Sequence, residues 1–242
     1  MKIYILLYLV FLPQLLFSQT LIAEYSIVQN STITLGGKER NVSLDLIGHL
    51  YKKGQKYIYW ETPSYLKKYP MGEISVNTIN GIESFGLDKD TTQWLYYSDF
   101  DEMIIRAKVS NGATAIHENS FELGYGLDWI YKPETKTING LKCQLVTDEG
   151  CTWKIWFCSD IQVKQNLLRI QNLTGLVVEA DFLPFNTHYK LLSYDTQSPI
   201  DDAVFEPNEF KQPFEKGPVL KSIYGKGRQK TKLENQQEIL KQ

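Results

Sequence analysis

Residues 141–158 read LKCQLVTDEGCTWKIWFC, two largely apolar runs separated by the polar triplet Asp148-Glu149-Gly150. Apolar and polar residues alternate within each run, a pattern typical of a strand with one buried face. A three-residue loop with Gly150 in the left-handed conformation would join the runs as an antiparallel hairpin and pair Thr147 with Cys151. The apolar side chains of the two runs would then face each other: Leu145, Cys143 and Leu141 opposite Trp153, Ile155 and Phe157.

The alternative register has a two-residue loop at residues 149–150. It would set Leu145 against Lys154, whereas the three-residue loop places every large apolar side chain except Val146 and Trp156 on one face. We therefore expect the three-residue loop.

The same register assigns positions to the three cysteines. Cys143 and Cys151 would share a face but stand about 13 Å apart along the strands, and Cys158 would point to the other face, so no disulfide is expected within the hairpin. Cys143 is expected to be a buried apolar thiol opposite Ile155. A nucleophilic role is not favoured, because neither a histidine nor a cationic cluster lies near it in the sequence.

Alternation recurs in the chain before this hairpin. Asn-Gly dipeptides at 80–81, 111–112 and 139–140 separate such runs and supply the positive φ angles that a two-residue hairpin needs. The pattern predicts a mainly β protein, with a strongly curved antiparallel sheet or an open β-barrel built as a meander of hairpins. The alternating apolar residues are Val42, Leu44, Leu46 and Leu50; Met103, Ile105, Ala107 and Val109; and Tyr125, Leu127, Trp129 and Tyr131.

Composition and the two ends of the chain define its organisation. The 242 residues are 43% hydrophobic and 22% charged, as in an ordinary folded domain. Residues 1–18 combine Lys2, an apolar run and the small Ser18, which predicts a cleaved signal peptide, export, and a periplasmic or outer-membrane-associated location. No later segment is apolar enough to predict a membrane span.

Residues 19–211 are expected to form a single β domain, and residues 212–242 a flexible basic extension. From residue 211 onward the chain carries 8 Lys and Arg against 3 Asp and Glu, with few large apolar residues after Tyr224. Such a segment could contact nucleic acid or an anionic surface, but in an exported protein a solvated extension is preferred and nucleic acid is not an expected partner. The sequence does not fix an oligomeric state.

The usual catalytic patterns are not found. His49, His117 and His188 are far apart and form no metal-ligand motif, so neither a metal nor another cofactor is expected. An S-x-x-K sequence at 64–67 lacks the later motifs of the penicillin-recognising enzymes. The acidic stretch 99–102 lacks the spacing of a calcium loop and predicts a solvated turn.

A family resemblance rests on three segments. Lys136, Ile138, Gly140 and Cys143 match a "K.I.Gy.C" pattern; Trp156, Phe157 and Ile161 match an aromatic "W[FY]t..I" pattern; and residues 172–177, NLTGLV, match Gly-Leu-Pro-Gly-Leu-Ile at Leu173, Gly175 and Leu176. In this order they resemble the GLPGLI family of exported Bacteroidetes proteins, with clear similarity over residues 129–205. Asn172, Thr174 and Val177 depart from the family hexamer. The resemblance implies export and a β fold, and it implies no activity, because none is established for the family.

The hexamer is interpreted as a structural motif at the start of a strand. Gly175 would permit a backbone geometry or a close approach that a side chain blocks. Leu176, Val178, Ala180 and Phe182 would then share one strand face. A binding role for the preceding loop, residues 162–174, is the alternative.

Two functions are consistent with these observations. The first is a non-catalytic envelope protein that binds an apolar, lipid-like ligand, or an envelope partner, on the concave face of the sheet. The second is a hydrolase of an envelope polymer, which would need converging carboxyl groups that the sequence does not reveal. Aromatic residues at period two are the candidates for the ligand site, although core packing alone would give the same pattern: Tyr57, Tyr59, Trp94, Tyr96, Tyr125, Trp129 and Tyr131.

Overall fold

The computed structural model describes residues 20–108, 115–168 and 170–221, so the signal segment, the Asn111-Gly112 turn and the end of the C-terminal extension lie outside the described residues. Fourteen strands and short 3-10 turns make up the described part. The strands are β1 (Thr20–Leu35), β2 (Lys38–Lys53), β3 (Lys56–Thr62), β4 (Glu73–Thr78), β5 (Gly81–Gly86), β6 (Gln93–Asp99), β7 (Ile104–Lys108), β8 (Ile116–Ser120), β9 (Trp129–Ile138), β10 (Leu141–Asp148), β11 (Trp153–Cys158), β12 (Leu176–Phe182), β13 (Thr187–Asp195) and β14 (Glu215–Lys216).

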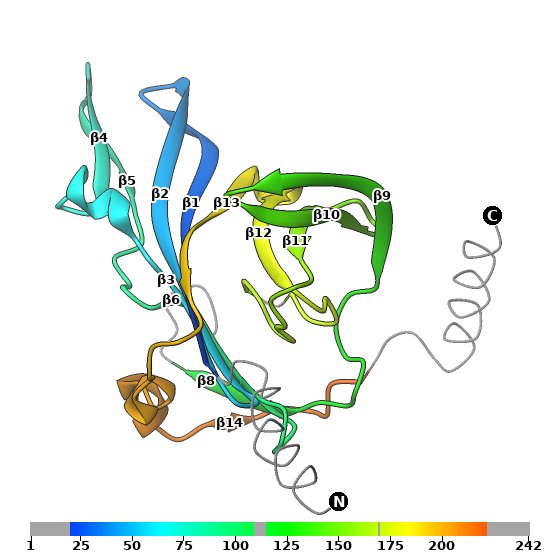
Figure 1. The fold of residues 1–242 in the computed structure, drawn as a ribbon. Coiled ribbons are helices and arrows are strands. Elements are labelled where there is room, and N and C mark those ends of the chain that lie inside the picture. Colours follow the sequence, from blue (N-terminus) through cyan, green and yellow to red (C-terminus); the bar gives the residue numbers. More distant parts are fainter. Residues whose placement is uncertain (1–19, 109–114, 169, 222–242) are drawn as a thin grey trace, which may run out of the picture.

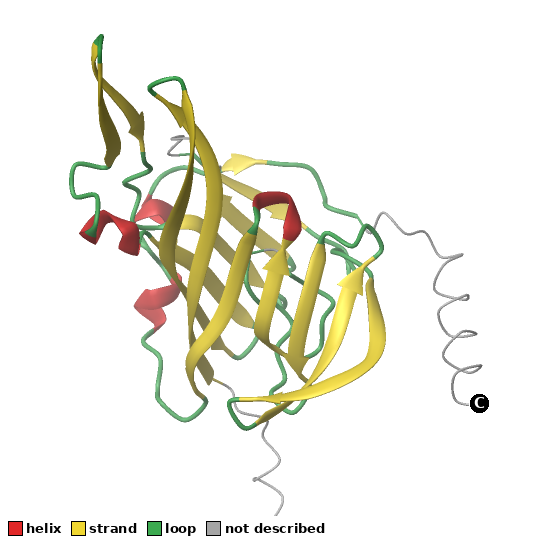
Figure 2. Cartoon of the chain, turned by 90° about the horizontal axis from the view of Figure 1, so that it is seen from above, coloured by secondary structure: helices red, strands yellow, loops and turns green. Residues whose placement is uncertain are grey.

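Twelve strands form one curved sheet, in the order β14-β8-β7-β6-β3-β2-β1-β13-β12-β11-β10-β9 (Figures 1 and 2). Two meanders build it. The chain runs outward from β1 to β8, crosses to β9, and returns through neighbouring strands to β13, which pairs with β1. The hairpin of β4 and β5 projects beside the tip of β1 and β2 as a separate small sheet.

The main sheet stays open, with β14 and β9 as its two edge strands. Its neighbours pair antiparallel except β14 and β8, which are parallel. The register shifts within four strand pairs, β1–β13, β3–β6, β9–β10 and β11–β12, and such bulges bend strands and increase their twist. The predicted mainly β fold with a strongly curved sheet is confirmed.

Strand β3 of the outward meander is buried on both faces. Tyr57 and Tyr59 point into the large core cluster on the concave side, while Ile58 between them packs on the convex side. There Ile200 and Phe205 cover it, because the chain after β13 crosses back over this face through η4 (Asp202–Phe205) and η5 (Asn208–Lys211) to reach β14.

The first residues of the expected C-terminal extension lie along the sheet. Glu215 and Lys216 pair with β8, and Leu220 forms a bridge to Phe121. Phe214 packs near the guanidinium group of Arg106, 4.3 Å from ring centroid to Cζ. Contacts with the β domain thus continue to residue 220, beyond the expected boundary at residue 211.

The predicted register of the β10–β11 hairpin is wrong. Thr147 pairs with Lys154 and Val146 with Ile155, so the loop consists of residues 149–152 and is one residue longer than expected. The left-handed residue is Cys151, with a φ of 51°, and not Gly150. The side chain of Asp148 stabilises this turn, because its carboxylate accepts hydrogen bonds from the Trp153 N–H and the Thr152 hydroxyl at 2.7 and 2.6 Å.

This register changes the surroundings of the cysteines. Cys143 is buried as expected, but Ile155 does not pair with it. Cys158, which was expected on the other face, lies in the same core cluster and is close enough to contribute to the raised pKa of Cys143. All three cysteines are free, and Cys151 is exposed.

The two Asn-Gly turns within the described residues differ from each other. Asn139 and Gly140 form the expected two-residue loop between β9 and β10, with φ angles of 51° and 80°. In the β4–β5 hairpin Thr78 pairs with Gly81, so the loop consists of Ile79 and Asn80 instead of Asn80 and Gly81. Thr78 fixes that shift, since its hydroxyl accepts from the Asn80 N–H and donates to the Gly81 carbonyl.

Residues 172–177 lead into β12 beside the end of β11. Gly175 has a φ of 147°, and a Cβ at this position would lie 2.6 Å from the Cys158 carbonyl oxygen and 2.6 Å from a ring carbon of Phe157. Leu173 and Leu176 are fully buried on either side of it, whereas Thr174 is exposed. Close packing therefore requires a glycine here.

The buried side chain of Asn166 holds the same segment in place. Its Nδ2 donates to the Gly175 carbonyl and its Oδ1 accepts from the Val177 N–H, both at 2.9 Å. Asn172 has a φ of 60° and donates to the Gly124 carbonyl at 3.0 Å, which ties the segment to the β8–β9 connection. The two bonds of Asn166 satisfy buried backbone groups of this segment.

Candidate ligand-binding cavity

A cavity of about 750 Å³ lies on the concave side of the sheet. This volume falls within the range of roughly 300–1,000 Å³ that is usual for small-molecule sites. Eight neighbouring strands each contribute a side chain to its wall, in the order β11, β12, β13, β1, β2, β3, β6 and β7: Trp153, Phe182, Tyr189, Ile27, Leu46, Glu61, Tyr96 and Ala107.

Strand register explains how residues so far apart in the chain line one wall. Tyr189 pairs with Ile27 and Ile27 with Leu46, so these three form a row across β13, β1 and β2. Tyr96 pairs with Ala107 farther along the sheet. Residues at period two along each strand point to the same side, so the concave curvature brings the rows around one space.

Two connections close the cavity opposite the sheet. The β8–β9 connection contributes Tyr125 and Leu127, and the β11–β12 connection contributes Leu168 and Ile170. Leu168 and Ile170 belong to residues 162–174, the loop for which a binding role was the alternative interpretation. Trp94 and Phe185, which are 42% and 56% exposed, mark where the lining meets solvent.

Glu61 is the one carboxyl group among the described lining residues. Its side chain is 3% exposed and its Oε1 accepts a hydrogen bond of 2.7 Å from the Tyr59 hydroxyl. Burial raises the pKa of Glu61 to about 7, although the hydrogen bond from Tyr59 opposes that rise. The carboxyl is therefore partly protonated near neutral pH.

The sheet makes room for this pair at Gly48. Gly48 is the residue of β2 that pairs with Glu61 of β3, and a Cβ there would lie 2.9 Å from the Tyr59 hydroxyl oxygen. Any larger residue would displace the Tyr59 ring or the hydroxyl that hydrogen-bonds Glu61. The glycine is thus part of the construction of the site.

Tyr59 and Tyr189 lie close to the Glu61 carboxyl, and Tyr25 lies close to Tyr59. Burial raises the pKa values of Tyr25, Tyr59 and Tyr189, and the charge of Glu61 raises those of Tyr59 and Tyr189 further. The Tyr25 hydroxyl donates to the Val177 carbonyl at 3.0 Å and so joins the floor of the site to β12. All three phenols are neutral at physiological pH, so they offer hydrogen bonds without charge.

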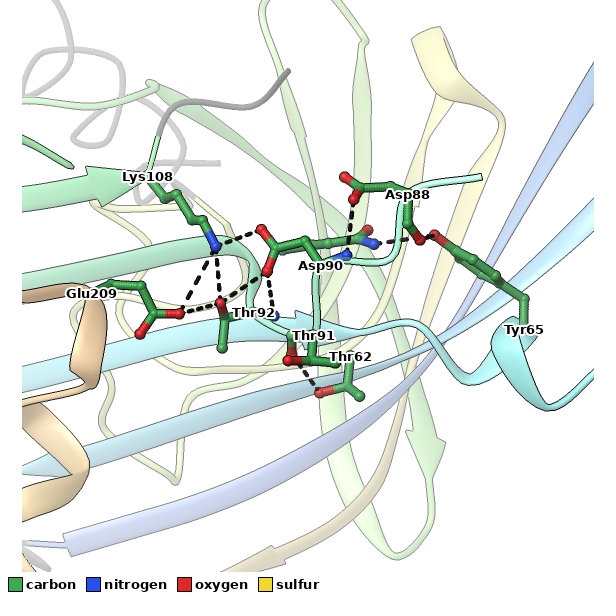
Figure 3. Close-up of polar contacts among 9 residues, drawn as sticks. Thr62, Tyr65, Asp88, Asp90, Thr91, Thr92, Lys108 and Glu209 are labelled. Atoms are coloured by element: carbon green, nitrogen blue, oxygen red, sulfur yellow. Dashed lines mark hydrogen bonds and ion pairs between the residues drawn. The ribbon is translucent and has the colours of Figure 1, made fainter. Parts of the chain in front are cut away.

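Lys108 lies at the edge of the cavity within the polar network that Figure 3 shows. Its Nζ is 2.5 Å from Asp90 Oδ2 and 3.9 Å from Glu209 Oε1, and it donates to the Thr92 hydroxyl at 3.0 Å. Partial burial disfavours the ionised form of Asp90, but Lys108 and Thr92 hold the pKa of that carboxyl below its usual value. The network anchors the loop before β6 to η5.

The seven aromatic candidates separate into two groups. Trp94, Tyr96 and Tyr125 line the cavity. Tyr57 and Tyr59 are buried in the core beside it, and Trp129 is buried with its Nε1 donating to the Gln171 carbonyl at 2.7 Å. Tyr131 is 43% exposed on the edge strand β9.

Trp94, Tyr125 and Leu127 do not lie in regular strands, although the sequence pattern predicted that they would. Trp94 has a φ of 55° in a bulge of β6, where the pairing with β3 shifts between Tyr59 and Glu61. Tyr125 and Leu127 precede β9 and belong to a loop, because Gly124 and Gly126 adopt positive φ angles of 85° and 131° that interrupt an extended strand. The prediction of one continuous strand through Tyr125 and Tyr131 is wrong.

Sequence reasoning missed Glu61, although a signal for it was present. Tyr57 and Tyr59 were recognised as sharing a strand face at period two, and Glu61 is the next residue of that series. A carboxyl group that continues an aromatic face is unusual, because an ionised side chain is costly to bury. That pattern could have identified it.

The acidic stretch 99–102 has a structural role in this fold. Asp99 is buried and caps a turn by accepting from the N–H groups of Asp101 and Glu102, so the stretch is not simply a solvated turn. Within the described ranges, no three His, Cys, Asp or Glu side chains gather in a way that could hold a metal ion. The same ranges contain no helix with the length and apolar character to span a membrane.

Comparison with known proteins finds partial similarity to solved structures. No protein-family model and no curated protein matches the chain. Two structures of PNGF-II are similar over 84% and 83% of this chain, with TM-scores of 0.47 and 0.44 and sequence identities of 15% and 14%. This chain spans about a third of the PNGF-II chains, 32% and 31% of their length.

A DUF1329 family protein from Desulfovibrio piger is similar over 77% of this chain and 89% of its own, with a TM-score of 0.26 and 10% identity. We draw no conclusion about function from these similarities.

Proposed function

We propose that this protein is an exported cell-envelope protein of the GLPGLI family that binds an apolar, lipid-like ligand in the concave cavity and has no catalytic role of its own. The expected signal segment, residues 1–18, and the motif matches in residues 129–205 support export and family membership. The cavity supports binding.

The binding proposal rests on the unfilled cavity, because the side chains around it are otherwise tightly packed. Protein cores contain few voids larger than a water molecule, so an aromatic face that served packing alone would be filled. Here about 750 Å³ remains beside fully buried residues such as Ile27 and Tyr59. Apolar side chains dominate its wall, which matches the lining of sites for apolar ligands.

The hydrolase alternative receives less support. Glycoside hydrolysis and comparable reactions use two carboxyl groups that face each other across the substrate. Glu61 has no second carboxyl opposite it among the described residues of the cavity wall.

The chain contains its own reporters of binding. Trp94 and Trp153 line the cavity, whereas Trp60 stacks between His49 and Tyr51 away from it. We therefore propose tryptophan fluorescence titrations with a series of straight-chain alcohols from octanol to tetradecanol. Trp94→Phe and Trp153→Phe should each lose part of the response, and Trp60→Phe should keep it.

Affinity should rise about fourfold per added methylene group until the cavity is full, because each buried methylene contributes about 0.8 kcal/mol. Native mass spectrometry of the protein purified without detergent provides a second readout. A flat titration with every alcohol, together with no co-purified ligand, would remove the binding proposal. Association with an envelope partner would then be the function to test.

A further inference from the structure

The structure carries one inference about the chemical class of the ligand, and it rests on the proposed binding function. We propose that Glu61 selects amphiphiles whose polar group donates hydrogen bonds, such as a long-chain amine or alcohol, and that this group lies inside the cavity at Glu61. The hydrocarbon chain lies along the apolar wall. Amphiphiles with a carboxylate head group bind more weakly.

The first support is the unused capacity of the carboxyl group. Tyr59 is the one hydrogen-bond partner of Glu61 among the described residues. An ionised carboxyl has about four acceptor positions, and a buried one without further partners is costly. Glu61 faces a space large enough for a ligand group, so a donor there would satisfy it.

The second support is the position of Glu61 within the wall. It lies on β3, between Leu46 of β2 and Tyr96 of β6, with further strands that line the cavity on either side. Apolar residues continue on both sides of it, Ile27 and Phe182 toward β12 and Ala107 toward β7. A ligand that reaches Glu61 therefore has apolar surface for its chain in either direction.

The third support is the charge of the other lining residues. Lys108 and Lys221 are the lysines that the described wall contains, and each faces a carboxylate. Lys108 lies beside Asp90 and Glu209, and Lys221 Nζ is 3.8 Å from Glu122 Oε1. An anionic head group would thus meet lysines that are already neutralised, and Glu61 would repel it farther inside.

Protonation of the carboxyl gives the inference a pH signature. The titratable groups that interact with Glu61 are the phenols of Tyr59, on the same strand, and Tyr189, on β13, and their raised pKa values keep them neutral throughout the neutral range. Lys108 and Lys221, at the edge of the cavity, are each paired with carboxylates. Ionisation of Glu61, whose pKa is about 7, should therefore strengthen amine binding and weaken fatty-acid binding as the pH rises.

The test compares three probes of equal chain length: decylamine, decanol and decanoic acid. Dissociation constants are measured by calorimetry at about pH 6 and about pH 8, on either side of the Glu61 pKa of about 7, for the wild type, Glu61→Gln and the control Glu24→Gln. Glu24 is a partly exposed carboxyl beside His49, away from the cavity wall.

At the higher pH the wild type should bind the amine at least about tenfold more tightly than the acid, because hydrogen bonds to charged groups contribute about 1.5–3 kcal/mol. Glu61→Gln should abolish that preference and its pH dependence, whereas Glu24→Gln should keep both. Thermal melting shows whether each variant is folded.

The outcomes are separable. If none of the three probes binds, the proposed binding function itself fails. If all three bind equally and Glu61→Gln changes nothing, the cavity binds ligands but the head-group inference is overturned. Tighter binding of the acid, lost in Lys221→Met, would place the head group at the edge and would also overturn it.

Discussion

Replacement of Glu61 by Gln should change how the stability of the protein depends on pH. Burial raises the pKa of Glu61 from 4.5 to about 7 in the folded protein. A group with a raised folded pKa contributes stability that is fully present below its unfolded pKa and is lost as the pH rises through the folded value. The window is therefore about pH 4.5 to pH 7.

The magnitude follows from the size of that shift. One pKa unit corresponds to about 1.4 kcal/mol, so the rise from 4.5 to about 7 predicts a loss of about 3 kcal/mol across the window. Glu61 is almost fully buried, so solvent screening should not reduce this figure greatly. Gln has the same shape and no charge, and it should not show the loss.

The assay is urea unfolding of the wild type and Glu61→Gln at several pH values across the window. His49 contributes with the opposite sign, because burial lowers its pKa despite the nearby Glu24, so its stabilising contribution is lost as the pH falls. That contribution is common to both proteins and cancels in the difference. Parallel pH profiles for the two proteins would refute the reasoning that Glu61 is buried in an apolar site.

Three further predictions concern other parts of the chain. Gly175→Val should destabilise the fold by about 3 kcal/mol or more, since it adds both a strained φ and a Cβ 2.6 Å from the Cys158 carbonyl oxygen; unchanged melting would contradict this. Cys143, whose pKa burial raises to about 11, should resist alkylation in the native state while the exposed Cys151 reacts, and fast native labelling of Cys143 would show that it is accessible. Intact mass of the protein recovered from producing cells should lack the segment through about Ser18, and retention of Met1 would argue against export.

The class of fold could be predicted because it depends on local patterns. Period-two alternation located strands such as β2 and β12, and Asn139-Gly140 marked its turn correctly, because these features need only neighbouring residues. The register of strand pairing was harder to predict than the positions of the strands. In the β10–β11 hairpin the side chain of Asp148 stabilises a longer connection, and a register shift between Gln144 and Val146 changes which residues face the core.

The candidate site was predictable only in part, since it depends on long-range packing. Period two placed Tyr57, Tyr59 and Tyr96 on the concave side, but it could not show that the first two would be covered while Tyr96 borders an open space. That difference depends on the loop around Ile170, which folds against the sheet from far along the chain. Such a long-range contact cannot be predicted from the pattern of neighbouring residues.

The most direct test of the central claim is to fill the cavity and measure binding. Ala107 lines the cavity on β7, so Ala107→Phe should occupy ligand space, while Ile82→Phe adds bulk to the exposed face of β5. Calorimetric titration with dodecanol should show saturable binding to the wild type and Ile82→Phe, and at least about tenfold weaker binding to a folded Ala107→Phe, because several methylene groups would lose their apolar contacts. Equal affinity of Ala107→Phe and the wild type would contradict the claim that this cavity is the binding site.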